Sequence, residues 1–404
     1  MSWDTVEFQK LFSIPSKNGL TRPAKVRGAG FKMINMGELF SYGRISNVEM
    51  ERVPMSEKEL DGMLVEEGDL LFARQSLVLS GAGKCSIVVS IDEPVTFESH
   101  IIRVRLDHEV ACPIFYYYYF LSPFSGIKSI VTQGVQAGIR GSDLKKLKVW
   151  CPPRGVQKSI ALKLSYYDDL IENNRRRIQL LEESARLLYK EWFVHLRFPG
   201  HEHVKVINGV PEGWEPCLLP QVIEVNPKER IEKGKEIAYI PMSALSETNM
   251  TVDVSKFEQR TKHTNVKFRQ HDVLLARITP CLENGKTGYV YFLKEDEQAC
   301  GSTEFIVLRG KRVSSAFTYC LARSEHFRET AIQSMTGSSG RQRVQASSLA
   351  DYSVPLPPQH LLEMFDEVAL QAFEQIGVLM AQNERLAKAR DLLLPKLMSG
   401  ELAA

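Results

Sequence analysis

Two polar, glycine-rich segments carry the side chains best suited to hydrogen bonding with nucleic acid bases. They are "TQGVQAGIRGSD" at 132–143 and "TGSSGRQRVQASS" at 336–348. In the major groove, arginine bonds guanine and glutamine bonds adenine, while glycine lets the backbone approach phosphates. The candidate base contacts are Gln133, Gln136, Arg140, Arg341, Gln342, Arg343 and Gln345. The alternative for each residue is an ordinary solvated loop position.

Four further basic residues occupy matching places along the chain. Arg74 and Arg277 each end an apolar run, where either residue could contact DNA or form a structural ion pair. Lys84 in "GAGKC" and Lys286 in "ENGKTG" follow a glycine, but the first glycine of a phosphate-binding loop is missing from both segments. We therefore expect both lysines at hairpin tips, either solvated or resting on a DNA phosphate.

The sequence lacks the motifs of the enzymes that act on DNA. An adenine methyltransferase needs an Asn/Asp-Pro-Pro-aromatic element to hold a flipped base, but Asn226 is followed by one proline and a lysine. The Glu-x-Lys of many metal-dependent nucleases is missing, and its nearest match, Asp143 to Lys145, does not recur in the repeat described below. His201 and His203 alone make a poor zinc site. We expect no catalytic and no metal-binding residues.

These candidate residues lie in a chain that repeats itself. "GDLLFARQS" (68–76) returns as "HDVLLARIT" (271–279), "ESHIIRVRL" (98–106) as "STEFIVLRG" (302–310), and "GSDLKKLKVWCPP" (141–153) as "ASSLADYSVPLPP" (346–358). The offsets are 203, 204 and 205 residues, and the order is preserved. A period of this length is too long for a solenoid and indicates a duplicated unit, a domain followed by a helix.

Each repeat mixes strand and helix patterns. Short apolar runs predict strands at 68–72, 87–90 and 101–106, and again at 273–276, 289–292 and 305–308. Two further stretches, 113–127 and 315–332, space their apolar residues as helices do. Each unit is therefore predicted to be an α/β or α+β domain of roughly 150 residues.

A heptad seam follows each domain, and the two helices are candidates for one another's partners in an antiparallel coiled coil. The seam residues singled out are Ile171, Asn174, Ile178, Leu181, Leu188 and Trp192 in the first helix, and Ile376, Leu379, Asn383, Leu386 and Leu393 in the second. Asn174 and Asn383 each place one polar group in an apolar seam. Such a residue either fixes the register or faces water at the edge.

Helix length suggests a purpose for the duplication. A helix of about 35 residues is roughly 50 Å long at 1.5 Å per residue, which corresponds to roughly 15 base pairs of B-DNA. An antiparallel pair would hold two domains at the spacing of two half-sites. Near the end of the chain, Pro395 and Gly400 are residues that kink and stop helices, so 389–402 is predicted to be the docked end of the second helix.

Composition sets broader limits. The 404 residues are 44% hydrophobic and 25% charged, which is typical of a soluble chain of two or three domains. Seven cysteines without a Cys-x-x-Cys pair and a first segment unlike a signal peptide favour a reducing cytoplasm. The longest apolar run, 114–121, is too short for a membrane span. A net charge of +2 means that polyanion binding would depend on where the basic residues lie.

Several motifs together carry a family resemblance. "PPRGVQKSIA", "LIENNRRRIQLLEESARLLYKEWF", "EGW" at 212–214 and "LAKARDLLLPKLMSGEL" resemble the specificity subunit of bacterial type I restriction-modification enzymes. The resemblance covers the whole chain. It implies a target-recognition domain at 1–153, a central helical spacer at 154–198, a second target-recognition domain at 199–358 and a C-terminal helical spacer at 359–404.

The same resemblance implies a DNA-binding protein without catalysis of its own. Each domain would bind one half of a split target in double-stranded DNA, and the helices would set the spacer and hold two modification subunits. S-adenosylmethionine, ATP and Mg²⁺ would be used by the modification and restriction subunits, with no cofactor in this chain. The residues alone leave one alternative, a coiled-coil scaffold that joins two protein-binding modules.

Overall fold

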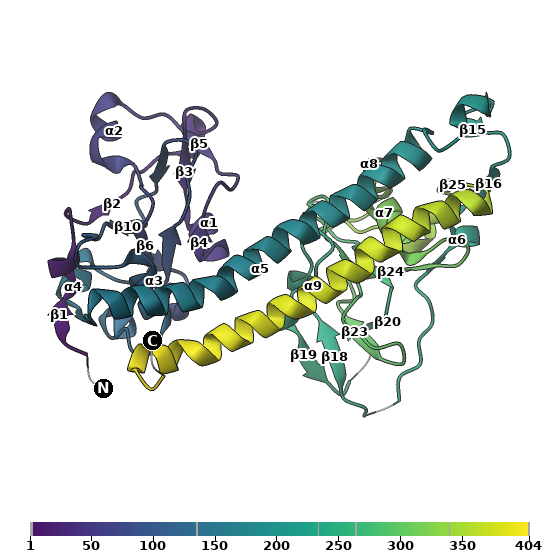
Figure 1. The fold of residues 1–404 in the computed structure, drawn as a ribbon. Coiled ribbons are helices and arrows are strands. Elements are labelled where there is room, and N and C mark those ends of the chain that lie inside the picture. The colour runs from purple at the N-terminus through teal and green to yellow at the C-terminus, as the bar shows by residue number, and fades with distance from the viewer. Residues whose placement is uncertain (1–2, 135, 233, 263–264, 339, 403–404) are drawn as a thin grey trace. The chain divides into compact units, whose positions relative to one another are not determined.

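The computed structural model describes residues 3–134, 136–232, 234–262, 265–338 and 340–402. The chain divides into two compact units, and Figure 1 labels many of their elements. The first contains the residues up to Ile171 and those from Glu384 onward, and the second contains Glu172–Asn383. Both long helices, α5 (Arg154–Tyr189) and α9 (Gln359–Ser399), therefore contribute residues to both units. The predicted division of the chain into four segments stays a prediction.

The first unit is built on two sheets. The larger sheet contains, in spatial order, β2 (Lys17–Asn18), β10 (Ile101–Val104), β6 (Leu70–Ala73), β8 (Cys85–Val88) and β4 (Arg44–Ile45). The smaller sheet contains β5 (Arg52–Val53), β3 (Phe31–Ile34) and β9 (Val95–Phe97). Strands β10, β6 and β8 pair antiparallel, whereas β3 and β9 are parallel. Helix α3 (Pro113–Leu121) packs against β8. This packing buries four consecutive tyrosines of α3.

Short elements complete the first unit. They are α1 (Met36–Ser41), α2 (Glu57–Met63), α4 (Gly141–Lys146), and β1 (Thr5–Glu7) paired with β13 (Lys148–Trp150). A further three-stranded sheet joins β11 (Thr132–Gln133), β12 (Ala137–Gly138) and β7 (Gln75–Ser76). This last sheet contains part of the first glycine-rich segment, so it positions the candidate base contacts of the first unit.

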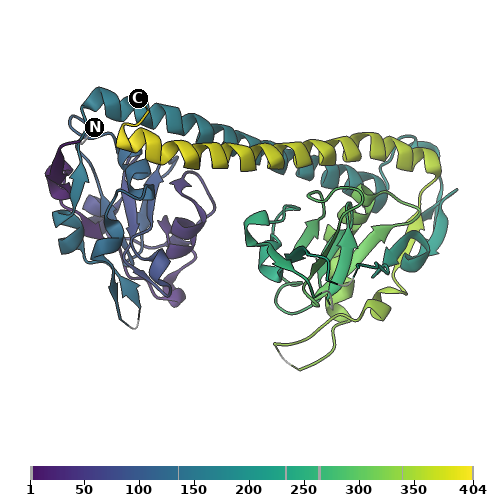
Figure 2. The same ribbon diagram turned by 90° about the horizontal axis from the view of Figure 1, so that it is seen from below.

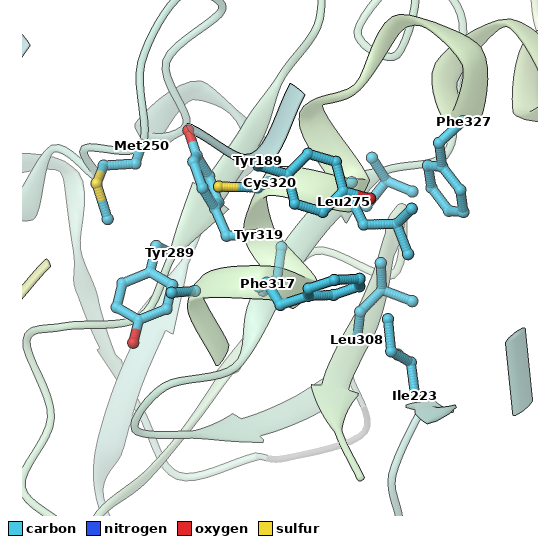
Figure 3. Packing of buried hydrophobic residues seen from close by; sticks show 14 of the residues in the cluster. Tyr189, Ile223, Met250, Leu275, Tyr289, Leu308, Phe317, Tyr319, Cys320 and Phe327 are labelled. Carbon is cyan, nitrogen blue, oxygen red and sulfur yellow. The ribbon is translucent and has the colours of Figure 1, made fainter. Parts of the chain in front are cut away.

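The second unit has a related architecture. One sheet contains β17 (Ile223–Val225), β24 (Phe305–Gly310), β21 (Val273–Ala276) and β22 (Thr287–Tyr289), and the other contains β19 (Glu258–Arg260), β18 (Ile237–Ile240), β23 (Gln298–Gly301) and β20 (Val266–Arg269). The other strands and short α-helices described in this unit are α6 (Leu219–Val222), α7 (Ser315–Arg323), α8 (Glu325–Gln333), β14 (Val206–Ile207), β15 (Val210–Pro211), and β16 (Glu215–Leu218) paired with β25 (Ser353–Leu356). Figure 3 shows Tyr189 of α5 among the side chains of this core, including Phe317 and Tyr319 of α7.

The duplication predicted from the sequence is confirmed by the topology. The order β10-β6-β8 of the first unit matches β24-β21-β22 of the second, and both units contain a parallel pair, β3 with β9 and β18 with β23. The strand predicted at 289–292 is wrong, because β22 ends at Tyr289. Val290 follows the last paired residue and is still fully buried in the core, so the apolar run extends beyond the strand. An apolar run reflects burial and does not show where strand pairing ends.

The two helices pair antiparallel within each unit, as predicted. In the first unit Asp168 of α5 contacts Arg390 of α9, and in the second unit Asn174 contacts Asn383 while Tyr189 packs near Phe365. Residue numbers thus rise along α5 as they fall along α9. The seam is buried or half-buried throughout, which follows from its apolar heptad spacing.

The end of α9 docks on the first unit. Leu394, Leu397 and Met398 are buried in the same core as Phe115 and Ile160, and the indole Nε1 of Trp3 donates a hydrogen bond to the carbonyl oxygen of Met398 at 2.7 Å. The helix continues through Pro395 and ends at Ser399. Gly400 follows with a φ of 72°, a left-handed conformation that favours glycine. No helix in the described residues is long and apolar enough to cross a membrane.

Candidate nucleic-acid interface

One buried ion pair recurs at the same place in both domains. Asp69 precedes β6 and accepts two hydrogen bonds from Arg105 at 2.8 Å each, while Asp272 precedes β21 and accepts two from Arg309 at 2.7 Å each. Asp69 and Asp272 are 0% and 1% exposed. Each aspartate also accepts a backbone N–H from the residue three positions before it. The pair therefore ties the two central strands of each sheet together at one end.

The opposite end of these strands carries the candidate DNA contacts. Arg74 follows β6, and its backbone N–H donates to the carbonyl oxygen of His100 at 2.7 Å. Arg277 follows β21, and its backbone N–H donates to the backbone carbonyl oxygen of Glu304 at 3.0 Å. The carbonyl oxygen of each arginine then accepts a hydrogen bond from the polar segment, from Ile139 in the first unit and from Val344 in the second, both at 2.9 Å.

In the first unit, backbone pairing holds the polar segment. Strand β12 pairs with β11 on one side and with β7 on the other. Gln133, Gln136 and Arg140 are exposed, and among the described residues their side chains form no hydrogen bond or ion pair. The Arg74 guanidinium contacts the carbonyl oxygen of Ser99 at 3.4 Å and forms no ion pair within the described chain. Figure 2 shows the β11–β12 hairpin on the side of this unit away from α5.

In the second unit, side chains hold the polar segment instead. Arg343 donates three hydrogen bonds of 2.8 to 3.0 Å to the carboxylate of Glu304, and this hydrogen bonding raises the pKa of the Arg343 guanidinium. Arg277 donates to the Oε1 of Gln345 at 2.9 Å. Two of the predicted base contacts, Arg343 and Gln345, are thus engaged within the protein, and Arg277 is bound to an amide rather than to a carboxylate.

Arg341 and Gln342 are the remaining candidates in the second unit. Arg341 is exposed and Gln342 is half-buried, and within the described ranges neither side chain forms a hydrogen bond or ion pair. The backbone carbonyl oxygen of Gln342 accepts a hydrogen bond from the backbone N–H of Thr279 at 3.1 Å. This bond fixes the position of Gln342 while its side chain stays unbonded within the described residues. In the second unit, the described residues on either side of 339 lie on the side away from α9 (Figure 2).

The two lysines predicted at hairpin tips occupy equivalent positions, directly before β8 and β22. Lys84 is half-buried and donates to the carbonyl oxygen of Phe40 at 2.7 Å, and burial lowers the pKa of its amino group. Lys286 lies 3.8 Å from the carboxylate of Glu247. Both lysines therefore have partners within their own unit, which the sequence did not indicate because those partners are 44 and 39 residues away in the chain.

Polar groups in the helix contacts were only partly foreseen. Asn174 Nδ2 donates to Asn383 Oδ1 at 3.0 Å. In the first unit, Asp168 accepts from the hydroxyl of Tyr118 at 2.5 Å and pairs with Arg390. In the second unit, Glu182 accepts from the Tyr319 hydroxyl at 2.6 Å and from the Met250 backbone N–H at 2.8 Å. Burial raises the pKa of the Glu182 carboxyl. Neither carboxylate is at a seam position, so the heptad pattern gave no signal for them.

The structure describes no group of three or more His, Cys, Asp or Glu residues that could hold a metal ion. Asp143 lies in the short helix α4, next to Ser142 rather than beside a second carboxylate. Fold and site together define a tandem-domain protein in which a repeated scaffold presents two different polar loops. The buried ion pair and the backbone attachment of the loops are the same in both domains down to single hydrogen bonds, whereas the loops are not.

The model of the type I restriction modification DNA specificity domain matches residues 2–183 and 211–363. The chain belongs to this family and is the specificity subunit of a type I restriction-modification system, with two tandem recognition domains. It is 25% identical over 373 residues to the type I restriction enzyme MjaIX specificity subunit of Methanocaldococcus jannaschii, a match that covers 89% of this chain and 85% of that one.

Two further similarities are informative. The type I restriction enzyme EcoEI specificity subunit of Escherichia coli is 34% identical over 157 residues, which is 37% of this chain and 26% of that protein. The crystal structure of a type I restriction-modification system S subunit from M. genitalium matches with a TM-score of 0.56 at 15% identity, over 98% of this chain and 96% of that one. The latter similarity shows that the two chains share a fold.

Proposed function

We propose that each recognition domain binds one half of a split target in double-stranded DNA through the loop at the Arg74 or Arg277 end of its central strands. One observation carries this proposal. The same backbone hydrogen bonds fix both arginines and both polar segments, while the side chains that the two segments present differ. A scaffold that is repeated with different exposed Arg and Gln side chains suits two different half-sites.

The base contacts that we assign are the candidates whose side chains remain available. They are Gln133, Gln136 and Arg140 in the first domain, and Arg341 and Gln342 in the second. Arg343 and Gln345 are assigned instead to holding the loop, because their side chains bond to Glu304 and Arg277. Lys84 and Lys286 are assigned to the scaffold for the same reason.

Catalysis is assigned to partner subunits. The chain lacks the motifs of adenine methyltransferases and of common nucleases, and its relatives bear the names of specificity subunits of restriction enzymes. We infer that two modification subunits that use S-adenosylmethionine dock on the helices α5 and α9, and that restriction subunits that use ATP and Mg²⁺ join through that complex. No cofactor is assigned to this chain, and the complex is expected to work in the cytoplasm.

Helix α5 is assigned to setting the number of base pairs between the half-sites. An insertion of four residues near Asn173 adds about 6 Å at 1.5 Å per residue and nearly completes one turn, so the seam stays roughly in phase. The half-sites should stay the same while the spacer grows by one or two base pairs. A two-residue insertion rotates the seam by about 200° and should abolish activity. An active four-residue variant with an unchanged spacer would refute this assignment.

The whole proposal is tested by mapping methylated positions. The chain is expressed with its modification subunits in a host that lacks other methyltransferases, and the modified sites are read from genomic DNA. A split target with two fixed halves and a spacer of constant length is expected. Methylation without a shared sequence, or no preference among random duplexes in a binding selection, would contradict sequence recognition by this chain.

A further inference from the structure

Three consecutive apolar residues of the first recognition domain point into solvent. Leu77, Val78 and Leu79 are 87%, 59% and 56% exposed. They join β7 to the short turn Leu79–Gly81. A run of exposed apolar residues is unfavourable in water and in natural proteins marks a surface that binds something. We call Leu77, Val78 and Leu79 the apolar tip.

The apolar tip is a defined loop beside the candidate base contacts. The backbone N–H of Val78 donates to the hydroxyl of Ser76 at 3.2 Å, and the N–H of Gly81 donates to the carbonyl oxygen of Val78 at 3.1 Å. A Cβ on Gly81 would lie 2.3 Å from the Ser76 hydroxyl oxygen and 3.0 Å from the Ser76 Cβ, so a larger residue would displace the Ser76 side chain. Ser76 itself pairs with Ala137 of the β11–β12 hairpin, which carries Gln133 and precedes Arg140.

The charge around the apolar tip favours a polyanion. Residues 74–83 contain Arg74 and no acidic residue, and residues 132–142 contain Arg140, with the next acidic residue, Asp143, in α4. DNA combines phosphates outside with an apolar base stack inside, and several DNA-binding proteins insert leucine or isoleucine between base pairs. A cationic and polar surface with an apolar tip matches that combination.

We propose that Leu77 inserts between two adjacent base pairs of the half-site bound by the first recognition domain, with Leu79 packed against the opened step. This inference deepens the proposed function and rests on it. Opening a base step costs least at pyrimidine–purine steps, so the first half-site should contain such a step at a position that no side chain contacts by hydrogen bonds. The apolar tip thereby adds specificity through deformation of the DNA.

At the corresponding described residues, 280–282, the second recognition domain has no apolar tip. At the offset of 203 residues, Leu77 corresponds to Pro280 and Leu79 corresponds to Leu282. Leu282 is 0% exposed and belongs to the hydrophobic core. Base-step opening is therefore expected in one half-site only, and the other half-site serves as an internal reference in the same DNA molecule.

The experiment uses the full chain assembled with its modification subunits and a duplex that carries the mapped target. 2-Aminopurine, whose fluorescence rises when it unstacks, is placed at successive positions of both half-sites but never at a methylated adenine, because methyltransferases flip that base themselves. The wild-type complex should raise the fluorescence at one step of the first half-site. Leu77→Ala should remove that signal and weaken binding about tenfold, the loss expected for one leucine that is no longer buried.

Val110→Ala is the matched control, because Val110 is another exposed apolar loop residue of the same unit, at 45% exposure. It should change neither fluorescence nor binding. Leu77→Ser serves as a second variant, with circular dichroism as the measure of folding. Specific binding by the wild type without a signal at any step overturns the insertion and leaves the proposed function standing. Loss of the modification subunits with unchanged DNA signals would identify the apolar tip as a protein-docking surface and also overturn it.

Discussion

The two recognition domains use one scaffold and hold their DNA-facing loops in different ways. In the first, β12 pairs with β11 and β7, so backbone hydrogen bonds fix the hairpin and leave its exposed side chains available. In the second, Arg343 bonds to Glu304 and Arg277 bonds to Gln345, so side chains hold the loop. The positions equivalent to Glu304 and Arg343 are His100 and Gly138, which cannot form that ion pair.

This difference indicates where the duplicated unit tolerates change. The buried pairs Asp69–Arg105 and Asp272–Arg309 sit at one end of the central strands and are the same in both copies. The loops at the other end share their backbone attachment at Arg74 and Arg277 and differ in almost everything else. A fixed attachment with variable side chains lets each domain acquire its own half-site without loss of the fold.

The largest effect is expected at the repeated ion pair. Asp69→Ala and Asp272→Ala should each destabilise their own domain by about 3 kcal/mol, because a mostly buried guanidinium and a backbone N–H lose their main acceptor. Hydrogen exchange should show lost protection in β6 and β10 for the first variant, and in β21 and β24 for the second. The exposed Asp61→Ala and Asp296→Ala are the controls. Equal loss of protection in both domains from either variant would contradict two separate cores.

The next effect concerns base contacts. Arg140→Ala should relax recognition at one position of the first half-site and Arg341→Ala at one position of the second, each by about 2 kcal/mol of discrimination if the arginine bonds a guanine. Selection from a randomised duplex library measures both half-sites at once. If either variant relaxed both half-sites equally, the assignment of one domain to one half-site would be wrong.

A smaller effect is expected where the helices meet in the second unit. Asn174→Leu leaves the Asn383 amide without its partner and should lower the free energy of unfolding by about 1 kcal/mol. Asn174→Leu/Asn383→Leu should recover that loss, because an apolar pair fits the seam, while the helix register becomes less well fixed. Urea unfolding of the single and double variants forms a mutant cycle. Additive losses would show that the two amides do not interact.

The smallest effect directly tests the difference between the loops. Glu304→Gln removes the charge that holds Arg343, and because this pair is partly exposed the expected loss is about 0.5 kcal/mol, roughly a twofold loss in recognition of the second half-site. The loss should shrink at high salt, where the ion pair is already screened. His100→Gln, at the equivalent place in the first domain, should leave its half-site unaffected. An equal effect of His100→Gln would mean that the loops are not held differently.

Local and repeated patterns were predictable from the sequence. The duplication follows from matched segments at nearly one offset, and the helices follow from an apolar heptad whose period is a property of the chain itself. The central strands were predictable because they are fully buried runs such as Leu70–Ala73 and Val273–Ala276. The polar segments were found by composition, since exposed Arg, Gln and Gly cluster there in both copies.

Only the tertiary structure decided which of those side chains are available. Glu304 lies 39 residues from Arg343, and Asp69 lies 36 residues from Arg105, so no local pattern could reveal either pair. The same holds for burial: Leu79 and Leu282 occupy equivalent positions in the two repeats, yet one is exposed and the other is in the core. Sequence by itself determined the elements and their duplication, because both depend on spacing along the chain. Contacts between distant residues determined the site, because they exist only once the sheets have formed.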